Sequence, residues 1–195
     1  MAPDEAGCYA QIVRFLSYVP NHGGAIPPIT PTGDDPKREC AELRTIIPRR
    51  RQRMYQVRKI IASLFDKDSF MEIGPYWGTT AIVGFARLNG RPVGLIANNP
   101  EVGAGALDHS GSQKLSKHLK LCDVFGLPMI QLVDVPGFAV GTVVEKAGVM
   151  KWGTDLFKVY FTTTIPIFTI VTRRCYGIAG AILADCRDPN YVVGW

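Results

Sequence analysis

The chain has 195 residues, of which 47% are hydrophobic, and its 22 lysines and arginines outnumber 17 acidic residues, giving a formal net charge of +5. This length allows one core, or one core with a loose extension, and the composition indicates that the bulk of the chain is a folded soluble protein. The apolar runs are shorter than the roughly 20 residues of a membrane-spanning helix, so we expect no membrane segment. The acidic start Met1–Glu5 differs from secretory and mitochondrial leaders, which predicts a cytoplasmic protein and makes a mitochondrial one the weaker alternative.

Neither the cysteines nor the basic residues form a recognisable motif. The five cysteines and three histidines are too scattered for a zinc or redox site, so we expect reduced thiols and no metal. Arginines cluster within Arg49–Arg53, without the interleaved aromatic residues of a nucleic-acid surface. We interpret this run as the solvated end of a linker and expect no nucleic-acid partner. Contact with the phosphates of a nucleotide-like substrate stays open.

The first predicted element is a helix from Glu5 to Tyr18, because apolar residues recur there at intervals of three and four, and Pro20 ends it. The segment from Asn21 to about Pro48 is rich in proline and is expected to run extended over a surface. Three apolar residues can anchor its far end: Leu43, Ile46 and Ile47. These features divide the chain into residues 1–20, 21–53 and 54–195.

The compact part begins with a helix near residues 57–64 and a strand over Phe70–Ile73. A hairpin follows, because the apolar runs Thr80–Leu88 and Pro92–Ala97 flank Asn89-Gly90. Asn-Gly readily adopts the positive φ angles that a two-residue primed turn requires. Antiparallel strands are therefore expected at the start of the sheet.

Helices and strands then alternate. Two capping-box pairs, Ser110 with Gln113 and Thr142 with Glu145, predict helix starts. The predicted elements are a helix ending near Gly126, a strand over Met129–Val133, a helix over Val143–Thr162, a strand over Ile167–Val171, a short helix after Gly177 and a last strand from Tyr191. This alternation predicts an α/β protein.

Two sharp bends are the best candidates for a site. Pro136-Gly137 follows the strand that ends near Val133, and Gly177 follows the next strand. Ligands of α/β proteins bind where strand ends face helix starts, because backbone N–H groups there lack partners. The sequence therefore predicts a site that works through backbone donors more than through acidic or basic side chains.

Several ordered motifs resemble the carboxyltransferase (β) subunits of biotin-dependent acyl-CoA carboxylases, propionyl-CoA carboxylase type, in the ClpP/crotonase superfamily. The similarity runs from about Cys8 to Trp195. The segments that carry it are Tyr55–Ile61, Val83–Arg87, Gly90–Gly94, Ala97–Pro100, Leu107-Asp108, Lys114, Leu121–Asp123, Leu132–Gly141 and Ile170–Gly177.

This resemblance implies an incomplete ClpP/crotonase-like (ββα) spiral core with an N-terminal helix and a proline-rich linker. Residues 1–20 would be the remnant helix of a missing N-terminal crotonase domain, and residues 54–195 the first part of the C-terminal, biotin-side domain. The acyl-CoA-binding domain would lie outside the chain. We therefore expect the chain alone to be poorly active or inactive.

The resemblance also assigns roles at the two bends. The family's biotin-side oxyanion hole maps onto the backbone amides of Ile178 and Ala179, where the family commonly has glycine at the first position. The residues expected to line the biotin pocket are Val135, Pro136, Gly137, Phe138, Tyr176 and Gly177. Gly180 and Ala181 stand where the family often has an aromatic and an acidic residue, and they would shape the acyl pocket.

The implied cofactor is biotin carried on a separate protein, with an acyl-CoA as substrate. The implied partners are a biotin carboxylase or biotin carrier subunit, together with an acyl-CoA-binding carboxyltransferase domain or a second copy of the chain. Three alternatives stay open: a non-catalytic scaffold, a fragment of a longer carboxylase gene, and a decarboxylase of a malonyl-type CoA.

Several residues have a plainer structural interpretation. Gly177–Gly180 could serve close helix packing, and Val135–Phe138 an ordinary turn. Gly103–Ala106 matches a dinucleotide-binding loop only weakly, because no suitable strand, helix and acidic residue surround it. His109 and His118 are expected to be exposed or packed, since no serine or cysteine partner is evident, and Lys114 is expected to form an ion pair.

Overall fold

The computed structural model describes residues 4–50, 52–184 and 191–194. Arg51, Cys186 and Trp195, which entered the sequence analysis, lie outside this part of the chain. Within the described residues, one six-stranded sheet has its strands in sequence order. The strands are β1 (Met71–Ile73), β2 (Ala81–Leu88), β3 (Arg91–Asn98), β4 (Met129–Val135), β5 (Ile167–Cys175) and β6 (Val192–Gly194).

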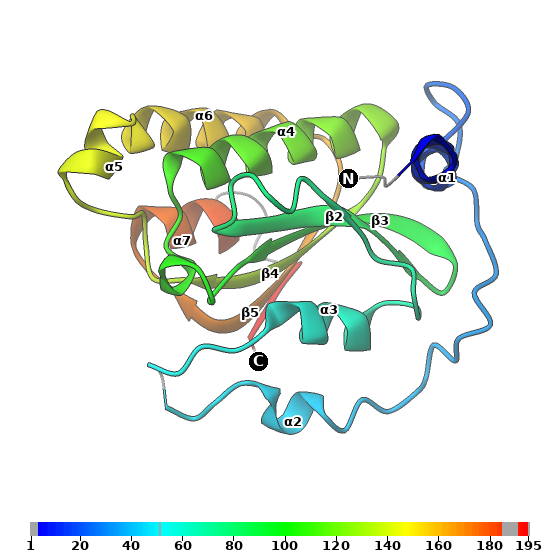
Figure 1. The fold of residues 1–195 in the computed structure, drawn as a ribbon, viewed down its shortest axis with the longest axis horizontal. Coiled ribbons are helices and arrows are strands. Elements are labelled where there is room, and N and C mark those ends of the chain that lie inside the picture. The colour runs from blue at the N-terminus through cyan, green and yellow to red at the C-terminus, as the bar shows by residue number, and fades with distance from the viewer. Residues whose placement is uncertain (1–3, 51, 185–190, 195) are drawn as a thin grey trace.

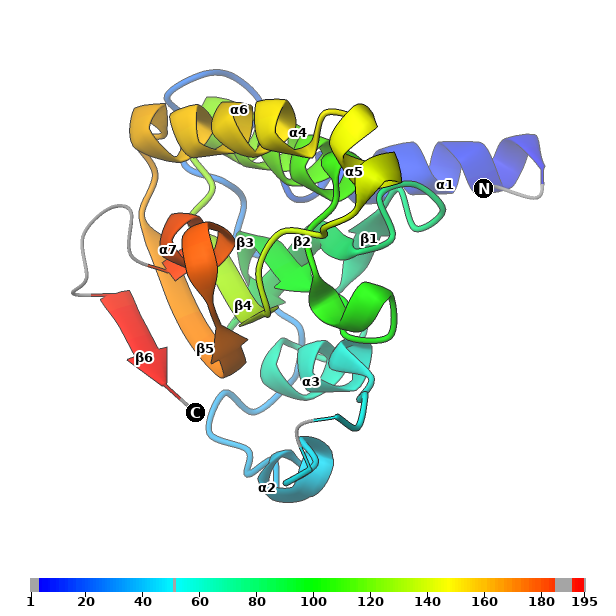
Figure 2. The same ribbon diagram turned by 90° about the vertical axis from the view of Figure 1, so that its left-hand side faces the viewer.

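The sheet changes character at β3. Strands β1, β2 and β3 pair antiparallel, whereas β3, β4, β5 and β6 pair parallel. Figure 2 shows β6 at the edge of the sheet beside β5. The carboxyl ends of β4 and β5 consequently lie next to each other, which is where both predicted bends begin.

Helices cover both faces of this sheet (Figure 1). The helices of the described residues are α1 (Glu5–Leu16), α2 (Leu43–Ile46), α3 (Val57–Leu64), the 3₁₀ turn η1 (Gly103–Gly105), α4 (His109–Phe125), α5 (Thr142–Lys146), α6 (Val149–Thr162) and α7 (Gly177–Ala184). Helices α4, α6 and α7 pack on one face and enclose the larger core, whereas α3 packs on the other. The predicted α/β class is confirmed. None of the helices in the described ranges is long and apolar enough to cross a membrane.

The predicted hairpin is confirmed. Asn89 and Gly90 have φ angles of 50° and 77°, as a primed two-residue turn requires. The Asp66 carboxylate accepts hydrogen bonds from both of their amides, at 2.9 and 2.7 Å. A buried acidic side chain therefore holds the turn from outside the hairpin.

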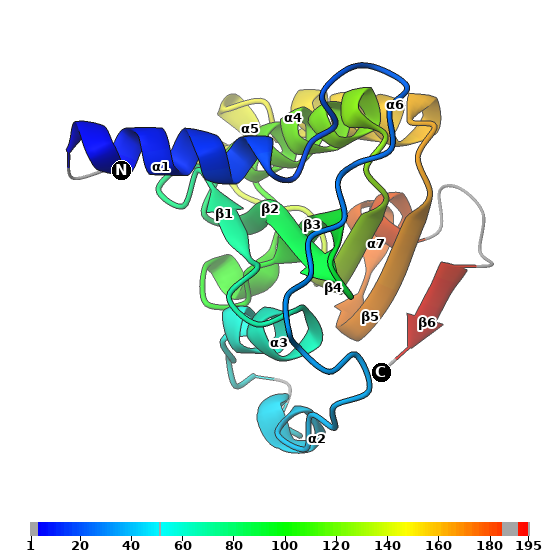
Figure 3. The same ribbon diagram turned by 90° about the vertical axis from the view of Figure 1, so that its right-hand side faces the viewer.

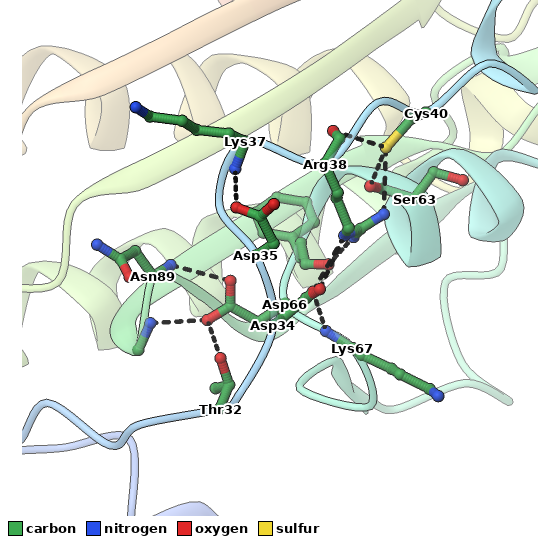
Figure 4. A network of polar contacts seen from close by, with 12 residues as sticks. Thr32, Asp34, Asp35, Lys37, Arg38, Cys40, Ser63, Asp66, Lys67 and Asn89 are labelled. Carbon is green, nitrogen blue, oxygen red and sulfur yellow. Dashed lines mark hydrogen bonds and ion pairs between the residues drawn. The ribbon is translucent and has the colours of Figure 1, made fainter.

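The linker runs along the side of the molecule from α1 to α2 (Figure 3), as expected for a proline-rich segment. Polar contacts hold its middle (Figure 4): Thr32 Oγ1 donates to Asp66, and the Arg38 guanidinium binds Asp34 and the carbonyl of Phe65. Its far end packs against the α3 side of the core through the three predicted anchors Leu43, Ile46 and Ile47.

Three local predictions were wrong. The single helix expected over 143–162 is two helices, because Gly148 adopts a left-handed φ of 81° between α5 and α6. Asp108, not Ser110, caps α4, accepting from the Gly111 amide at 2.7 Å. Thr142 is the first residue of α5 and makes no side-chain cap, since Gly141 occupies the cap position.

Strand β5 is longer than predicted because it continues past an irregularity. Val133 pairs with Val171, but Val135 pairs with Cys175. One residue of β4, Asp134, therefore faces three residues of β5. This bulge brings two consecutive arginines, Arg173 and Arg174, to the end of the strand just before α7.

Candidate functional site

The start of α7 presents unpaired backbone donors. The first hydrogen bond of this helix runs from the Gly180 amide to the Tyr176 carbonyl, at 3.1 Å. The amides of residues 177–179 precede it and so have no acceptor within the helix. Gly177, with φ of 63°, makes the turn from β5 into α7. The predicted sharp bend before α7 is therefore present, and its first amides have no acceptor within the helix.

The two amides predicted as oxyanion donors differ in access. Ile178 is 64% exposed, whereas Ala179 is fully buried in the larger core. Gly177, the residue before Ile178, is also exposed. A ligand would meet Ile178 first, and the role expected for the Ala179 amide stays a prediction.

An apolar pocket of about 220 Å³ adjoins this helix start. It is lined by Phe138, Met150, Gly153, Thr154, Phe157, Ile178 and Ile182. Phe138 comes from the first predicted bend and Ile178 from the second, so the fold brings the two bends to one pocket. The Thr154 hydroxyl, the one side-chain hydroxyl among these lining residues, donates to the Met150 carbonyl.

The Phe138 ring is held by close packing on α6. A Cβ atom added to Gly153 would lie only 2.7 Å from the ring carbon Cζ of Phe138. The backbone of Phe138 is also fixed, because the segment around it pairs with Leu107: the Leu107 amide donates to the Gly137 carbonyl, and the Ala139 amide to the Leu107 carbonyl. One wall of the pocket is therefore rigidly placed.

Other predicted site residues lie differently. The Val135 side chain is fully buried in the core and does not line this pocket, and its carbonyl accepts from the Tyr176 amide. The biotin contact expected of Val135 stays a prediction. Gly180 packs on the Cys175 backbone, where a Cβ would lie 2.6 Å from the carbonyl carbon, which fits the helix-packing interpretation. Ala181 is exposed on α7. The substrate contacts expected of Gly180 and Ala181 stay predictions.

Pro136 and Gly137 form the half-buried turn between β4 and Phe138. Gly137 has a φ of 136°, a conformation that favours glycine, and no atom within 4 Å of a built Cβ. The backbone there is thus open to the approach of another group. Tyr176 is about half exposed and lies beside this turn, because its backbone amide donates a hydrogen bond to the Val135 carbonyl.

Beneath the two bends lies a buried ion cluster that the sequence analysis missed. Asp134 accepts from Nε and Nη2 of Arg173, at 3.1 and 2.8 Å, and from Nε of Arg174, at 2.7 Å. The side chains of these three residues are only 2%, 8% and 13% exposed, respectively. Tyr55 lies against the same cluster, with the guanidinium of Arg173 over its ring, and burial raises the pKa of its hydroxyl.

The α6 residues of the pocket were also missed. Met150, Gly153 and Phe157 recur at helical spacing on one face of α6, which is a signal present in the sequence. It does not distinguish a pocket wall from ordinary core packing, because both require the same periodicity.

The remaining chemical candidates are structural. His118 is buried, and burial lowers its pKa to about 4. Burial also lowers the pKa of Lys114, whose Nζ donates to the Ala81 carbonyl at 2.8 Å. This backbone contact replaces the ion pair expected of Lys114. Neither side chain lines the pocket beside α7, so the packed interpretation of His118 is confirmed.

Comparison with known proteins agrees with this fold. The family model described as carboxyl transferase domain matches residues 1–195. The chain is 38% identical over 197 residues to the methylmalonyl-CoA decarboxylase subunit alpha of Veillonella parvula, covering 100% of this chain and 38% of that protein. It is 38% identical over 181 residues to the mitochondrial propionyl-CoA carboxylase beta chain of Sus scrofa, and this match covers 91% of this chain and 34% of that protein.

Among solved structures, transcarboxylase 12S with hydrolysed methylmalonyl-coenzyme A bound superposes with a TM-score of 0.93 at 32% identity. That match covers 99% of this chain and 38% of the other. The chain thus spans little more than a third of the length of these relatives. The match to the family model over the whole sequence, together with the crotonase-like fold, shows that the chain belongs to the carboxyl transferase domain family.

Proposed function

We propose that this chain supplies the biotin-facing half of a carboxyl-transfer site. The reaction moves a carboxyl group between carboxybiotin on a separate carrier protein and the α-carbon of an acyl-CoA such as propionyl-CoA or acetyl-CoA. The proposal rests on one juxtaposition: Phe138 and Ile178 line the same apolar pocket beside free amides at the start of α7.

The residues present fit the head of biotin, which combines an apolar ring system with one urea group. The pocket lining is apolar and includes Ile178, whose amide, like that of Gly177, precedes the first hydrogen bond of α7. Carboxybiotin, when bound, would supply the carboxyl group. The Ile178 amide would hold an oxygen that gains negative charge during transfer, and the positive end of α7 favours that charge.

The thioester half of the site would come from outside the described chain. Relatives are nearly three times as long, and α1 leaves an apolar face exposed, made up of Tyr9, Ile12, Val13 and Leu16. We propose that an acyl-CoA-binding carboxyltransferase domain, or a second copy of the chain, completes the site. A biotin carboxylase or carrier subunit would deliver the carboxyl group.

A second candidate is the opposite direction of transfer, from a methylmalonyl-type CoA to biotin, as in a decarboxylase. The match to a methylmalonyl-CoA decarboxylase subunit alpha over 100% of this chain favours it. The same amide donors would serve both directions, because the same oxygen gains or loses charge. Product analysis from both starting substrates separates the two candidates.

Reconstitution tests the proposal. The purified chain would be mixed with the acyl-CoA-binding part of a propionyl-CoA carboxylase beta chain, propionyl-CoA and a carboxylated biotin carrier. We expect transfer by the mixture and none by either component alone. Failure of every mixture to transfer, with both components folded, would contradict the proposal.

Two variants of one residue isolate the amide donor. Ile178→Pro removes the N–H in the first helical turn, where proline is tolerated, whereas Ile178→Ala keeps it. Loss of one oxyanion donor typically costs about 3–4 kcal/mol, so we expect Ile178→Pro to lose roughly a hundredfold or more in kcat. Ile178→Ala should retain activity within a few-fold. Equal activity of the two variants would exclude the Ile178 amide as a donor.

A further inference from the structure

We propose that Asp134, Arg173 and Arg174 form a positioning clamp that fixes the start of α7 against the loop after β4. The three residues stand at the base of the two bends. Asp134 immediately precedes Val135 in the sequence, and Arg174 lies two residues before Tyr176. None of them lines the pocket. The catalytic consequence of the clamp rests on the proposed function, but its structural consequence does not.

The bulge in β5 makes the clamp geometrically feasible. In a regular strand, consecutive side chains point to opposite faces of the sheet, so Arg173 and Arg174 could not both reach one carboxylate. Here three residues of β5 face the single residue Asp134 of β4. Both guanidinium groups therefore bind the same carboxylate, each on its own oxygen.

Each member of the clamp is tied to a further segment. The Asp134 amide donates to Asn98 Oδ1 at the end of β3. Arg173 Nη1 donates to the carbonyl of Arg53, at 2.7 Å, and Arg174 Nη2 to the carbonyl of Ala104 in η1, at 2.5 Å. The clamp thus joins the linker end, η1 and three strand ends at one point under the site.

Close packing leaves the backbone of Asp134 little room to move. A Cβ atom added to Gly105 would lie 2.5 Å from the Asp134 carbonyl oxygen, so η1 presses directly on the clamp. Just beyond the clamp, the Tyr176 amide donates a hydrogen bond to the Val135 carbonyl. The clamp therefore acts on the start of α7, and so on the Ile178 amide, whereas α6 and Leu107 hold the Phe138 ring that faces it.

Buried ion clusters add little net stability compared with apolar packing, but removing one partner leaves an uncompensated charge. Their value here is geometric, since guanidinium groups bind carboxylates in fixed, directional arrangements. A misplacement of about 1 Å in an active site can cost about 100-fold in rate. Loosening the clamp should therefore lower kcat strongly while leaving the KM for acyl-CoA within about two-fold, because that substrate binds elsewhere.

The test compares Arg174→Gln with a matched control, Arg58→Gln. Arg174→Gln removes one arm of the clamp and its tie to Ala104. Arg58 makes a two-point ion pair of similar length with Glu72, at 2.7 and 2.8 Å, on the far edge strand β1. The first measurement is the amide ¹H–¹⁵N spectrum of the full chain without ligand. The second is kcat and KM in the reconstituted transfer assay.

We expect Arg174→Gln to shift the Gly177, Ile178 and Phe138 amide signals, with the α3 signals unchanged, and to reduce kcat by about 100-fold. Arg58→Gln should move neither the site signals nor kcat. Site signals that superpose on those of the wild-type chain would overturn the clamp, whatever the activity. If Arg174→Gln does not fold, Arg174→Lys, which keeps the charge but not the second bond, is measured by the same criteria.

The two proposals fail separately. Shifted site signals in Arg174→Gln, together with no transfer by any wild-type mixture, would support the clamp and refute the proposed function. Transfer by the wild-type mixture with unchanged kcat in Arg174→Gln would refute the catalytic consequence of the clamp and leave the proposed function standing.

Discussion

At the scale of single residues, Gly153 illustrates how an absent side chain shapes the candidate pocket. The Phe138 ring occupies the space that a Cβ atom would need, 2.7 Å from its Cζ atom. Glycine in a helix interior ordinarily costs about 1 kcal/mol relative to alanine. Its presence in α6 is therefore explained by the ring that it admits.

We predict that Gly153→Ala displaces Phe138 toward the pocket and weakens biotin amide binding by the chain at least several-fold. Overpacking of about 1–3 kcal/mol would offset the gain in helix propensity, so the melting temperature should not rise. Isothermal titration calorimetry and thermal melting check both points. Lys151→Ala, an exposed change in the same helix, is the control. Unchanged binding in Gly153→Ala would show that the ring position is irrelevant.

His118 gives a prediction on pH. It packs against the Phe85 ring and the Cys122 thiol, and burial, assisted by the charge of Lys114, lowers its pKa from 6.5 to about 4. Between pH 6.5 and about 4, His118 is protonated in the unfolded chain but stays neutral in the folded chain. Stability contributed by neutral His118 is thus present above pH 6.5 and is lost as the pH falls toward 4, by about 3 kcal/mol in total.

Urea unfolding between pH 4 and 7 measures this loss. In His118→Gln the free energy of unfolding should depend less steeply on pH over that range, whereas His22→Gln, at an exposed site, should follow the wild-type curve. If the free energy of unfolding depended on pH equally steeply in His118→Gln and in the wild-type chain, the lowered pKa of His118 would be refuted.

At the scale of elements, the Asp66 carboxylate connects α3, the hairpin and the linker. It accepts from the amides of Asn89 and Gly90 and from the hydroxyl of Thr32. We predict that Asp66→Ala lowers the free energy of unfolding by about 2–3 kcal/mol, because it leaves donors in a largely buried region unpaired. Chemical denaturation measures this. The control is Asp35→Ala, because among the described residues this carboxylate accepts only from the amide of its near neighbour Lys37. Asp35→Ala should cost under about 1 kcal/mol, and equal costs for the two variants would contradict the account.

Elements with local signals could be predicted from the sequence. Asn89-Gly90 encodes its own turn, and the glycine at residue 177 marks the start of α7, because positive φ angles are a local demand. The break at Gly148 was missed because apolar residues continue across it at helical spacing. The cap of α4 was misassigned because Ser110 with Gln113 matches a common pattern, while Asp108 is better placed to accept.

The parts of the site that depend on tertiary register could not be predicted. Nothing local in the sequence shows that Arg173 and Arg174 both face Asp134, since this depends on a bulge between two strands. Likewise, the burial of Val135 and Ala179 depends on which helices pack over β4 and β5. The strand and turn pattern located the two bends and the family resemblance assigned roles to them, but their meeting at one pocket is a property of the assembled sheet and α6.

At the scale of the whole molecule, the proposed function makes the chain one part of a larger site. It spans 38% of a decarboxylase subunit and 34% of a carboxylase beta chain. The sheet, α6 and α7 organise one apolar pocket with backbone donors, and the acidic or basic groups nearby are engaged in the clamp. On the proposed function, such a unit would bind and orient one reactant while a partner domain would present the other.

Titration of the ¹⁵N-labelled chain with biotin amide, followed by the amide spectrum, tests this central claim most directly. The account predicts saturable shifts that are largest for the Gly177 and Ile178 amides, with smaller shifts around Phe138. Absence of saturable shifts up to millimolar ligand, or shifts confined to the linker and α3, would contradict it.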